Sequence, residues 1–237
     1  MTQDLAAATP ILHLQDVRYR WPGRASFGLS VPNFVLKTGE KLLLLGKSGS
    51  GKSTLLSLIC GTISVQSGMI SVAGTDISGL SEGERDRFRA DQIGLIFQQF
   101  NLLPYASVGD NILLPLRFAP ERRLRVEAPY AEATQLCKQL ELPKNVMSAR
   151  AGTLSVGQQQ RVAAARALIG SPPLIMADEP TSALDADTQA SFVELLFELS
   201  RSAGSSVLMV SHDARLANQF DRVVNLSDIA VTEAEAA

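Results

Sequence analysis

The sequence lacks the features that tie a chain to a membrane. No run approaches the roughly 18 to 20 apolar residues that span a bilayer. The opening residues MTQDLAAATP have neither a basic start nor an apolar central stretch, so they differ from a secretion signal. We therefore expect a chain that neither enters nor crosses a membrane by itself.

Cysteine is scarce as well. Cys60 and Cys137 are the only two, both lie among apolar residues, and neither belongs to a CxxC pattern. Two such cysteines are typical of buried thiols and not of a disulfide or a metal site. We expect core thiols and a reducing cytoplasm.

Positive charge is not in excess. The 22 lysines and arginines oppose 24 aspartates and glutamates, which gives a formal charge of −2. No stretch concentrates cations enough to follow a phosphodiester backbone, so we expect no nucleic-acid partner. The basic stretch ERRLR at 121–125 is expected to be a solvated face.

Apolar residues, by contrast, are abundant. They make up 46% of the 237 residues, against 19% charged residues, which excludes wholesale disorder. This length fits one domain, or one domain with a sizeable inserted lobe.

The hydrophobic pattern predicts an α/β fold. Alternation over 11–20 and an apolar stretch at 34–36 indicate antiparallel strands of a small sheet. Elsewhere, apolar runs alternate with helical periods, which favours a mostly parallel sheet. The further strands are expected at 41–45, 69–73, 93–97, 174–177 and 207–210, and the helices at 55–59, 79–91, 156–169 and 188–201. Between Gln98 and about Thr153 the helical periods are interrupted by prolines, which predicts an inserted helical lobe.

A glycine-rich loop follows the apolar run at 41–45. Residues Gly46 to Ser53 satisfy GxxxxGK[ST], whose glycines let backbone N–H groups close around phosphate oxygens at a helix start. Lys52 is expected to hold the β- and γ-phosphates. Ser53 offers a hydroxyl ligand to Mg²⁺. The alternative, a plain loop rich in glycine and serine, is weakened by its place between a strand and a helix.

Two carboxylates follow another buried strand. Asp178 and Glu179 come just past the apolar run at 174–177, at the strand end where open α/β sheets bind ligands. Asp178 is suited to hold Mg²⁺ through water, and Glu179 to accept a proton from an attacking water or to orient that water. On their own they also suit an acidic helix N-terminus, but the phosphate loop favours the metal and water roles.

Two further groups favour a phosphate ligand. His212 follows the strand at 207–210 and is expected to reach a γ-phosphate, whereas His13, inside an N-terminal strand, is expected to be an ordinary structural residue. Ser155 is a natural N-cap, and Gly157 leaves the first N–H groups of the next helix open to an anion. Taken alone, this segment also fits an ordinary capped helix.

In this order, the motifs resemble those of the ATP-binding cassette (ABC) ATPases, from about Ile11 to Asp228. They are GKSGSGKST, the Gln98 of IFQQFNLLP, LSVGQQQR, LIMADEP, SALD and SHD. The resemblance implies ATP and Mg²⁺ as cofactors and a P-loop NTPase core with a small antiparallel β subdomain and an inserted helical subdomain. It implies the Walker A loop at Gly46, Lys47, Ser48, Gly49, Ser50, Gly51, Lys52, Ser53 and Thr54, with Gln98, Ser53 and Asp178 at the metal. It also implies that Glu179, His212 and Gln98 are catalytic, Gln98 contacting both Mg²⁺ and water, and that Asp185 of the D-loop is among the nucleotide-binding residues.

The same resemblance implies an assembly. Family members act as head-to-tail homodimers, in which Ser155, Gly157 and Gln158 would meet the nucleotide on the partner's Walker A loop. Trp21 is expected to stack on adenine, with Tyr19 as the alternative. The signature reads LSVGQ, where glycine is commoner than Val156, so we expect altered dimer closure without loss of the site.

The resemblance also implies a place in the cell and a division of the chain. Stretches around residues 81–94 and 97–115 are similar to ATPases that serve lipoprotein-release, macrolide-export and cell-division complexes, so we expect a separate membrane permease as partner and a peripheral location on the inner face of the cell membrane. The segment Asn101 to Tyr105 is the expected permease contact, or else core of the helical lobe. The expected parts are an extension at 1–10, a nucleotide-binding core at 11–97 and 157–228, a helical subdomain at 98–156 and a frayed tail at 229–237.

Two other classes remain as alternatives. A soluble ABC ATPase acting without a permease would need tandem cassettes or a long coiled-coil insertion, and neither fits in 237 residues. A small-molecule kinase or GTPase would leave LSVGQ, Gln98 and His212 without roles.

Overall fold

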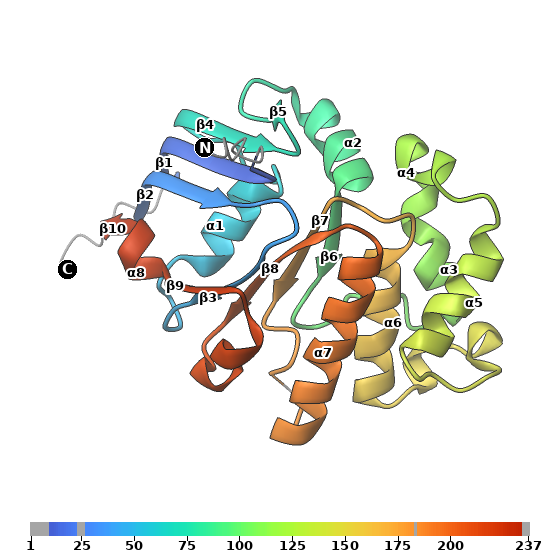
Figure 1. Ribbon diagram of the computed structural model, residues 1–237. Helices are drawn as coiled ribbons and strands as arrows, with labels where there is room; N and C mark the ends of the chain where they lie inside the picture. The colour runs from blue at the N-terminus through green and yellow to red at the C-terminus, as the bar shows by residue number, and fades with distance from the viewer. Residues whose placement is uncertain (1–9, 23–26, 183, 234–237) are drawn as a thin grey trace, which may run out of the picture.

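The fold consists of two five-stranded sheets with helices packed on and between them (Figure 1). The computed structural model describes residues 10–22, 27–182 and 184–233, so all but the last residue of the expected extension at 1–10 lies outside the described residues. One sheet is antiparallel, with strand order β10-β2-β1-β4-β5, and the other is parallel, with order β6-β7-β8-β3-β9. The predicted α/β class and both sheets are confirmed.

The strands and helices have the following bounds. The strands are β1 (Leu12–Arg20), β2 (Gly28–Leu36), β3 (Lys41–Leu45), β4 (Ser67–Val72), β5 (Thr75–Asp76), β6 (Ile93–Ile96), β7 (Leu174–Asp178), β8 (Ser206–Ser211), β9 (Arg222–Asn225) and β10 (Val231–Glu233). The α-helices are α1 (Lys52–Ile59), α2 (Glu82–Gln92), α3 (Val108–Leu113), α4 (Pro120–Leu124), α5 (Pro129–Gln139), α6 (Val156–Leu168), α7 (Ala186–Ser202) and α8 (Leu226–Ile229). Short 3-10 helices are η1 (Leu114–Arg117), η2 (Val146–Ser148), η3 (Ala151–Thr153) and η4 (Ala214–Gln219).

The parallel sheet is buried on both faces, which explains the continuous apolar runs of its central strands. Side chains alternate along each strand, so neighbours in one run belong to different cores. Leu42 and Leu44 pack with α1 and the antiparallel sheet, whereas Leu43 packs with α6 and α7. The sheet therefore holds α1 on one face and α6 and α7 on the other (Figure 1).

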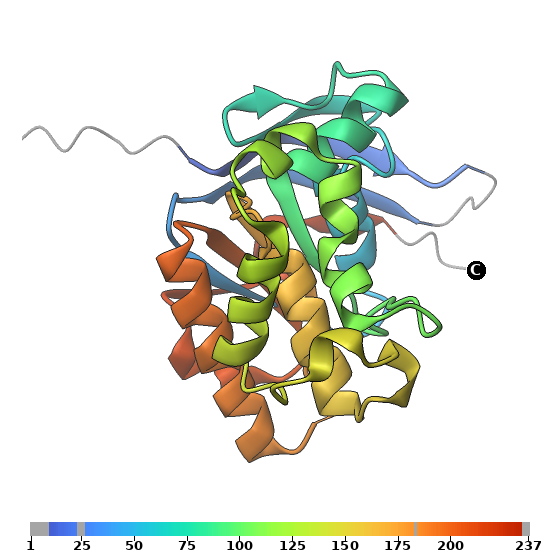
Figure 2. The same cartoon turned by 90° about the vertical axis from the view of Figure 1, so that its right-hand side faces the viewer.

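A group of helices lies beside this core. Helices α3 and α5 contact each other and α6, and they stand in front of the parallel sheet in Figure 2. All of α3 to α5 falls inside the stretch predicted to be helical. The exact division at residues 98 and 156 stays a prediction.

Cys60 and Cys137 are free, buried thiols, as expected. Burial raises the pKa of Cys60 to about 12 and that of Cys137 to about 11. Neither is a ready nucleophile at neutral pH, because the thiolate is the reactive form. Among the described helices, none is both long and apolar enough to cross a membrane.

Two predictions about the chain's surface are wrong. Arg122, in the basic stretch expected to be solvated, is 2% exposed, although Glu121, Arg123, Leu124 and Arg125 are exposed. Its guanidinium donates to backbone carbonyls at the end of α6, including Ile169 O at 2.6 Å and Ala167 O at 2.6 Å, which offsets the cost of burial. The local pattern of charged residues could not predict this burial, because the carbonyls that accept from Arg122 lie far away in the sequence.

The second correction concerns the chain's C-terminal part. Residues Val231–Glu233, expected in a frayed tail, form β10 and pair with Gly28–Ser30 of β2. Val231 and Thr232 are β-branched residues that favour strands, and they pair with the edge that β2 offers, which the small and acidic character of the whole segment did not indicate. Residues 234–237, also part of the expected tail, lie outside the described residues.

Candidate active site

The loop between β3 and α1 is shaped by glycines. Gly49 and Gly51 have φ values of 77° and 103°, which side chains with a Cβ rarely adopt. Gly51 is the N-cap of α1 and supplies no side-chain cap, so the first N–H groups of the helix stay available to a ligand. A Cβ at Gly51 would also meet the Phe27 ring at 3.0 Å. The predicted phosphate loop therefore has the backbone that anion binding requires.

Lys52 is fixed inside this loop. Its Nζ donates to the carbonyl oxygens of Gly46 at 2.6 Å and Lys47 at 3.0 Å, and the residue is 7% exposed. The ammonium also lies 3.5 Å from Glu179 Oε1. A buried cation with a neighbouring carboxylate and two carbonyls is held in place for an anionic ligand.

Glu179 and His212 meet at the carboxyl edge of the parallel sheet. Asp178 ends β7, and the Glu179 N–H donates to Val210 O of β8 at 2.9 Å. His212, just after β8, lies with its Nδ1 2.9 Å from Glu179 Oε2. Parallel neighbours place their carboxyl ends side by side, so residues 33 positions apart come into contact. Lys52, Glu179 and His212 thus form one connected group.

Asp178 is a partly desolvated carboxylate. Burial raises its pKa, the nearby Glu179 charge raises it further, and Lys52 opposes both. A cation at this point would relieve the penalty of holding the carboxylate ionised, because an opposite charge favours the ionised form. The position therefore suits a metal-binding carboxylate.

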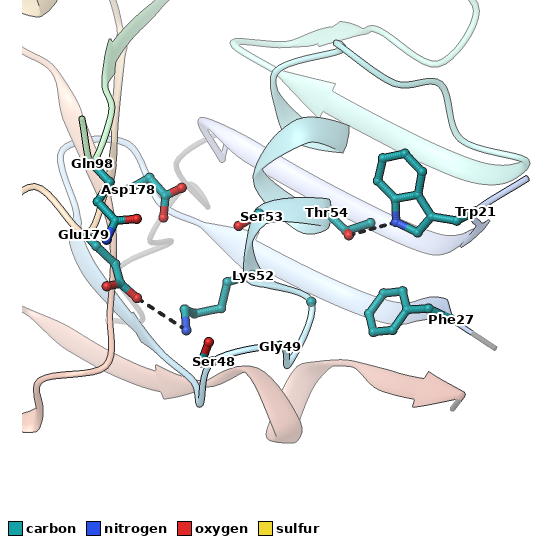
Figure 3. A pocket seen from close by; sticks show the side chains of 11 residues that line it. Trp21, Phe27, Ser48, Gly49, Lys52, Ser53, Thr54, Gln98, Asp178 and Glu179 are labelled. Atoms are coloured by element: carbon teal, nitrogen blue, oxygen red, sulfur yellow. Dashed lines mark hydrogen bonds and ion pairs between the residues drawn. The ribbon is translucent and has the colours of Figure 1, made fainter. Parts of the chain in front are cut away.

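One pocket joins the phosphate loop to Asp178 and Glu179 (Figure 3), whereas His212 is bonded to Glu179 and is not among the described residues that line the pocket. Gln98, Asp178 and Glu179 lie at one end, and Trp21 and Phe27 at the other, with the phosphate loop between them. The described residues that line it are Trp21, Phe27, Ser48, Gly49, Gly51, Lys52, Ser53, Thr54, Gln98, Asp178 and Glu179. The predicted phosphate-loop, metal and water-activating residues are therefore brought together.

The oxygen donors of this pocket fit Mg²⁺. Ser53, Gln98 and Asp178 offer a hydroxyl, an amide carbonyl and one carboxylate. Over the described ranges, no group of three or more His, Cys, Asp or Glu side chains is placed to hold a metal. Such a sparse donor set is what Mg²⁺ takes when ligand phosphates and water complete its octahedron. The buried Ser50 Oγ nearby has no hydrogen-bond partner in the described chain.

The aromatic end distinguishes the two candidates for adenine stacking. Trp21 lines the pocket, and Tyr19 does not; Tyr19 is 9% exposed and meets the Trp21 ring edge-on, with centroids 5.3 Å apart. Phe27, which the sequence analysis missed, also lines this end of the pocket, and the backbone N–H of Trp21 donates to Phe27 O at 3.3 Å. The signal that could have identified Phe27 is an aromatic residue directly before β2, the strand that pairs with β1, which Trp21 follows. Stacking on adenine by Trp21 stays a prediction.

Several predicted residues lie away from the pocket. Ser155 is the N-cap of α6 and forms a capping box, in which Ser155 Oγ accepts from Gln158 N at 3.3 Å and Gln158 Oε1 accepts from Ser155 N at 3.1 Å. Gly157 has open space around it. Asp185 is the N-cap of α7 and accepts from Thr188 N at 3.0 Å. None of these residues is among the described ones that line the pocket.

A glycine-rich loop before a helix, facing two carboxylates at the carboxyl edge of a parallel sheet, defines the class of P-loop nucleoside triphosphatases. Within that class the chain belongs to the ABC transporter family, because the family model described as ABC transporter matches residues 29–182. It is therefore an ABC ATPase cassette, as the motifs predict.

Relatives of this chain include ATP-binding proteins of transport systems. It is 39% identical over 221 residues to the lipoprotein-releasing system ATP-binding protein LolD of Novosphingobium aromaticivorans, covering 92% of this chain and 97% of LolD. It is 39% identical over 198 residues to the macrolide export ATP-binding/permease protein MacB of Rhodopirellula baltica, covering 84% of this chain and 29% of MacB. These similarities agree with the predicted subgroup.

A solved structure shares the fold. The dimeric post-hydrolysis structure of the ATP-binding cassette MJ0796 bound to ADP and Pi matches with a TM-score of 0.77 and 32% identity. The match covers 95% of this chain and 99% of that one. That relative is a dimer with products of ATP hydrolysis bound.

Proposed function

We propose that this chain hydrolyses ATP with Mg²⁺ as a head-to-tail homodimer and drives a membrane permease from the inner face of the cell membrane. The connected group of Lys52, Glu179 and His212 carries the proposal; Lys52 and Glu179 line the pocket together with Asp178, and His212 is bonded to Glu179. It places a cation, a carboxylate and an imidazole near the expected position of the γ-phosphate of a nucleotide bound to this loop.

Each residue has a distinct task in the proposed reaction. Backbone N–H groups of the loop and Lys52 bind and orient the phosphates. Ser53, Asp178 and Gln98 would hold Mg²⁺, which neutralises charge on the phosphate oxygens when bound. Glu179 orients the attacking water and takes its proton, while His212 holds the Glu179 carboxylate in position.

The α6 N-terminus supports a composite site. Ser155, Gly157 and Gln158 form an anion-binding helix end, yet they do not line the pocket of their own subunit. A second copy turned head to tail would bring this end to the nucleotide of the first. The dimeric structures of MJ0796 agree with a dimer for the family.

Trapping the dimer tests the composite site. Glu179→Gln keeps the shape of the side chain and removes the base, so the variant should retain ATP and accumulate as a dimer in the presence of Mg²⁺. Light scattering after size-exclusion chromatography measures the mass with and without ATP, and Lys52→Ala serves as a control that fails to bind nucleotide. A Glu179→Gln monomer carrying ATP and Mg²⁺ would contradict the composite site.

The segment Asn101 to Tyr105 is proposed as permease contact. Tyr105 is 75% exposed and Leu103 is half-buried, while buried Asn111 holds the loop by accepting from Leu103 N at 2.8 Å. Leu102 packs against the core, so the segment is partly lobe core as well. A fixed backbone with exposed apolar side chains suits a docking surface.

Leu103→Asp separates docking from nucleotide binding. The substitution should abolish permease binding and leave ATP binding unchanged. We would capture Leu103→Asp and wild-type protein from gently solubilised host membranes and identify the proteins that come with each. A multi-span protein recovered with wild type alone supports the permease role; recovery of only soluble partners would favour an ABC ATPase that acts without a permease.

A further inference from the structure

Trp21 is bonded to the phosphate loop as well as placed at the open end of the pocket. Its Nε1–H donates to Thr54 Oγ1 at 3.2 Å (Figure 3). Trp21 is the one tryptophan of the chain, and Thr54, in the first turn of α1, is 7% exposed. The bond joins the aromatic end of the pocket to the phosphate loop, since both residues line the pocket.

The direction of this bond decides what the threonine can do. A hydroxyl carries one proton to donate and two lone pairs that accept. An indole N–H only donates, so Thr54 Oγ1 accepts from Trp21 and keeps its own proton. Within helices a threonine hydroxyl commonly donates to a carbonyl one turn earlier. In the described chain Thr54 Oγ1 is bonded to Trp21 and donates to no carbonyl.

Trp21 is itself held on three sides. Its backbone N–H donates to Phe27 O at 3.3 Å, its ring meets Tyr19 edge-on at an interplanar angle of 89°, and its Nε1 bonds to Thr54. A ring held in this way is already restricted to few rotamers before a nucleotide binds. It can therefore fix the rotamer of a smaller side chain bonded to it.

We propose that Trp21 is a positioning residue that acts through Thr54. The indole N–H occupies a lone pair of Thr54 Oγ1 and directs its O–H at the nucleotide phosphate oxygen next to the ribose, so that the aromatic and phosphate ends bind as one unit. A phenylalanine at position 21 would keep a ring face and lose this link. The inference rests on the proposed nucleotide site and adds a role for Trp21 beyond ring stacking.

A double-mutant cycle isolates the link. Affinity for ADP with Mg²⁺ is measured by calorimetry, which avoids hydrolysis, for wild type, Trp21→Phe, Thr54→Val and the double variant. Trp21→Phe should weaken ADP binding about fivefold beyond any loss of stacking, because one hydrogen bond to the phosphate is misdirected. In the Thr54→Val background that extra loss should vanish, since no hydroxyl remains to be directed. Thr54→Ser keeps the hydroxyl and should keep the coupling.

Phe27→Leu is the matched control. Phe27 lines the same end of the pocket without a bond to Thr54, so its effect on ADP affinity should add to that of Thr54→Val. Thermal unfolding confirms that every variant is folded. If the effects of Trp21→Phe and Thr54→Val are additive too, Trp21 acts by ring packing alone and the inference is wrong.

The experiment also distinguishes this inference from the proposed function. Failure of wild-type protein to bind ADP would overturn the proposed nucleotide site itself. Emission from Trp21, the single tryptophan, gives a second readout that needs no nucleotide. Thr54→Val should shift that emission in the free protein, because it removes the acceptor of the indole N–H. An unchanged spectrum would count against the bond.

Discussion

At the scale of single residues, Glu179 combines an unusual backbone conformation with two charged neighbours. Its φ of 43° lies in the left-handed region, which costs a non-glycine residue about 1 kcal/mol or more. That conformation accompanies contacts from its two carboxylate oxygens to Lys52 and His212. The strained residue is therefore the one proposed to take the proton from water. Removal of His212 tests whether the position of the Glu179 carboxylate matters for that step.

His212→Ala should lower the turnover number for ATP and leave the Michaelis constant nearly unchanged. The loss should be on the order of 10²-fold, because Glu179 loses the partner 2.9 Å away that orients its carboxylate. Steady-state phosphate release measures both constants. His13→Ala is the control, since His13 bonds only to Asn33 among the described side chains, is not among the residues that line the pocket, and should change neither constant. Equal losses in both variants would contradict the role of His212.

At the scale of elements, α6 connects several parts of the fold. Its N-cap Ser155 faces outward in the signature segment, and Arg166 near its other end donates to Phe100 O at 2.5 Å and Asn101 O at 2.7 Å. Both acceptors have positive φ values, 56° and 49°, two and three residues after Gln98. One helix thus contacts the segment after Gln98 and carries the residues proposed to meet the partner's nucleotide.

Arg122 bonds to carbonyls at the C-terminal end of α6, and its removal should destabilise the protein. In Arg122→Met the carbonyls of Ile169 and Ala167 would lose their donor in a buried place, which should lower the free energy of unfolding by about 3 to 5 kcal/mol. Urea unfolding followed by circular dichroism measures the change. Arg123→Met, at an exposed neighbour, should cost less than about 1 kcal/mol. Comparable costs for both variants would show that the buried carbonyls do not depend on Arg122.

Val156 bears on how closely two subunits can approach. It begins α6 and is 49% exposed, so its branched side chain lies at the surface of the helix end proposed for the partner's phosphate. Val156→Gly in the Glu179→Gln background should strengthen the ATP-dependent dimer severalfold, although the glycine costs up to about 1 kcal/mol of helix stability. Analytical ultracentrifugation with ATP measures the dimer dissociation constant. A weaker dimer would mean that Val156 contacts the partner favourably.

At the scale of the whole molecule, each proposed active site needs two copies of the chain. The pocket supplies the phosphate loop, the metal ligands and Glu179, whereas the Ser155 end of α6 is left for another subunit. On this proposal activity belongs to the dimer, and the amount of dimer depends on protein concentration.

The rate of ATP hydrolysis per subunit should consequently rise with protein concentration and level off once the dimer predominates. Phosphate release at saturating ATP, measured over at least a hundredfold range of concentration, checks this. Light scattering at the same concentrations gives the dimer fraction that the rate should follow. A constant rate per subunit in samples shown to be monomeric would rule out a shared site.

The parts of this architecture that could be predicted from sequence are those that local pattern determines. The apolar runs of β3, β6, β7 and β8 predicted buried strands, and Ser155 predicted the start of α6. The pocket could be assembled because the carboxyl ends of parallel strands share one edge, which brings Asp178 near the phosphate loop.

The parts that sequence reasoning missed depend on contacts between distant segments. Phe27 joins the pocket through pairing of two strands, and β10 exists because β2 has a free edge. Arg122 is buried because carbonyls more than forty residues away accept from it. Such features become visible only when the register and packing of the fold are known.

The pairing of β10 with β2 has a practical consequence for handling the protein. A Cβ at Gly51 would come within 3.5 Å of the Thr232 methyl group, so this edge strand lies against the phosphate loop. Shortened versions that stop before Val231 would expose the edge of β2, which could pair with strands of other chains and aggregate. They would also remove the packing of Thr232 near Gly51 of the phosphate loop. Affinity tags and cleavage sites therefore belong beyond Glu233, joined through a flexible spacer.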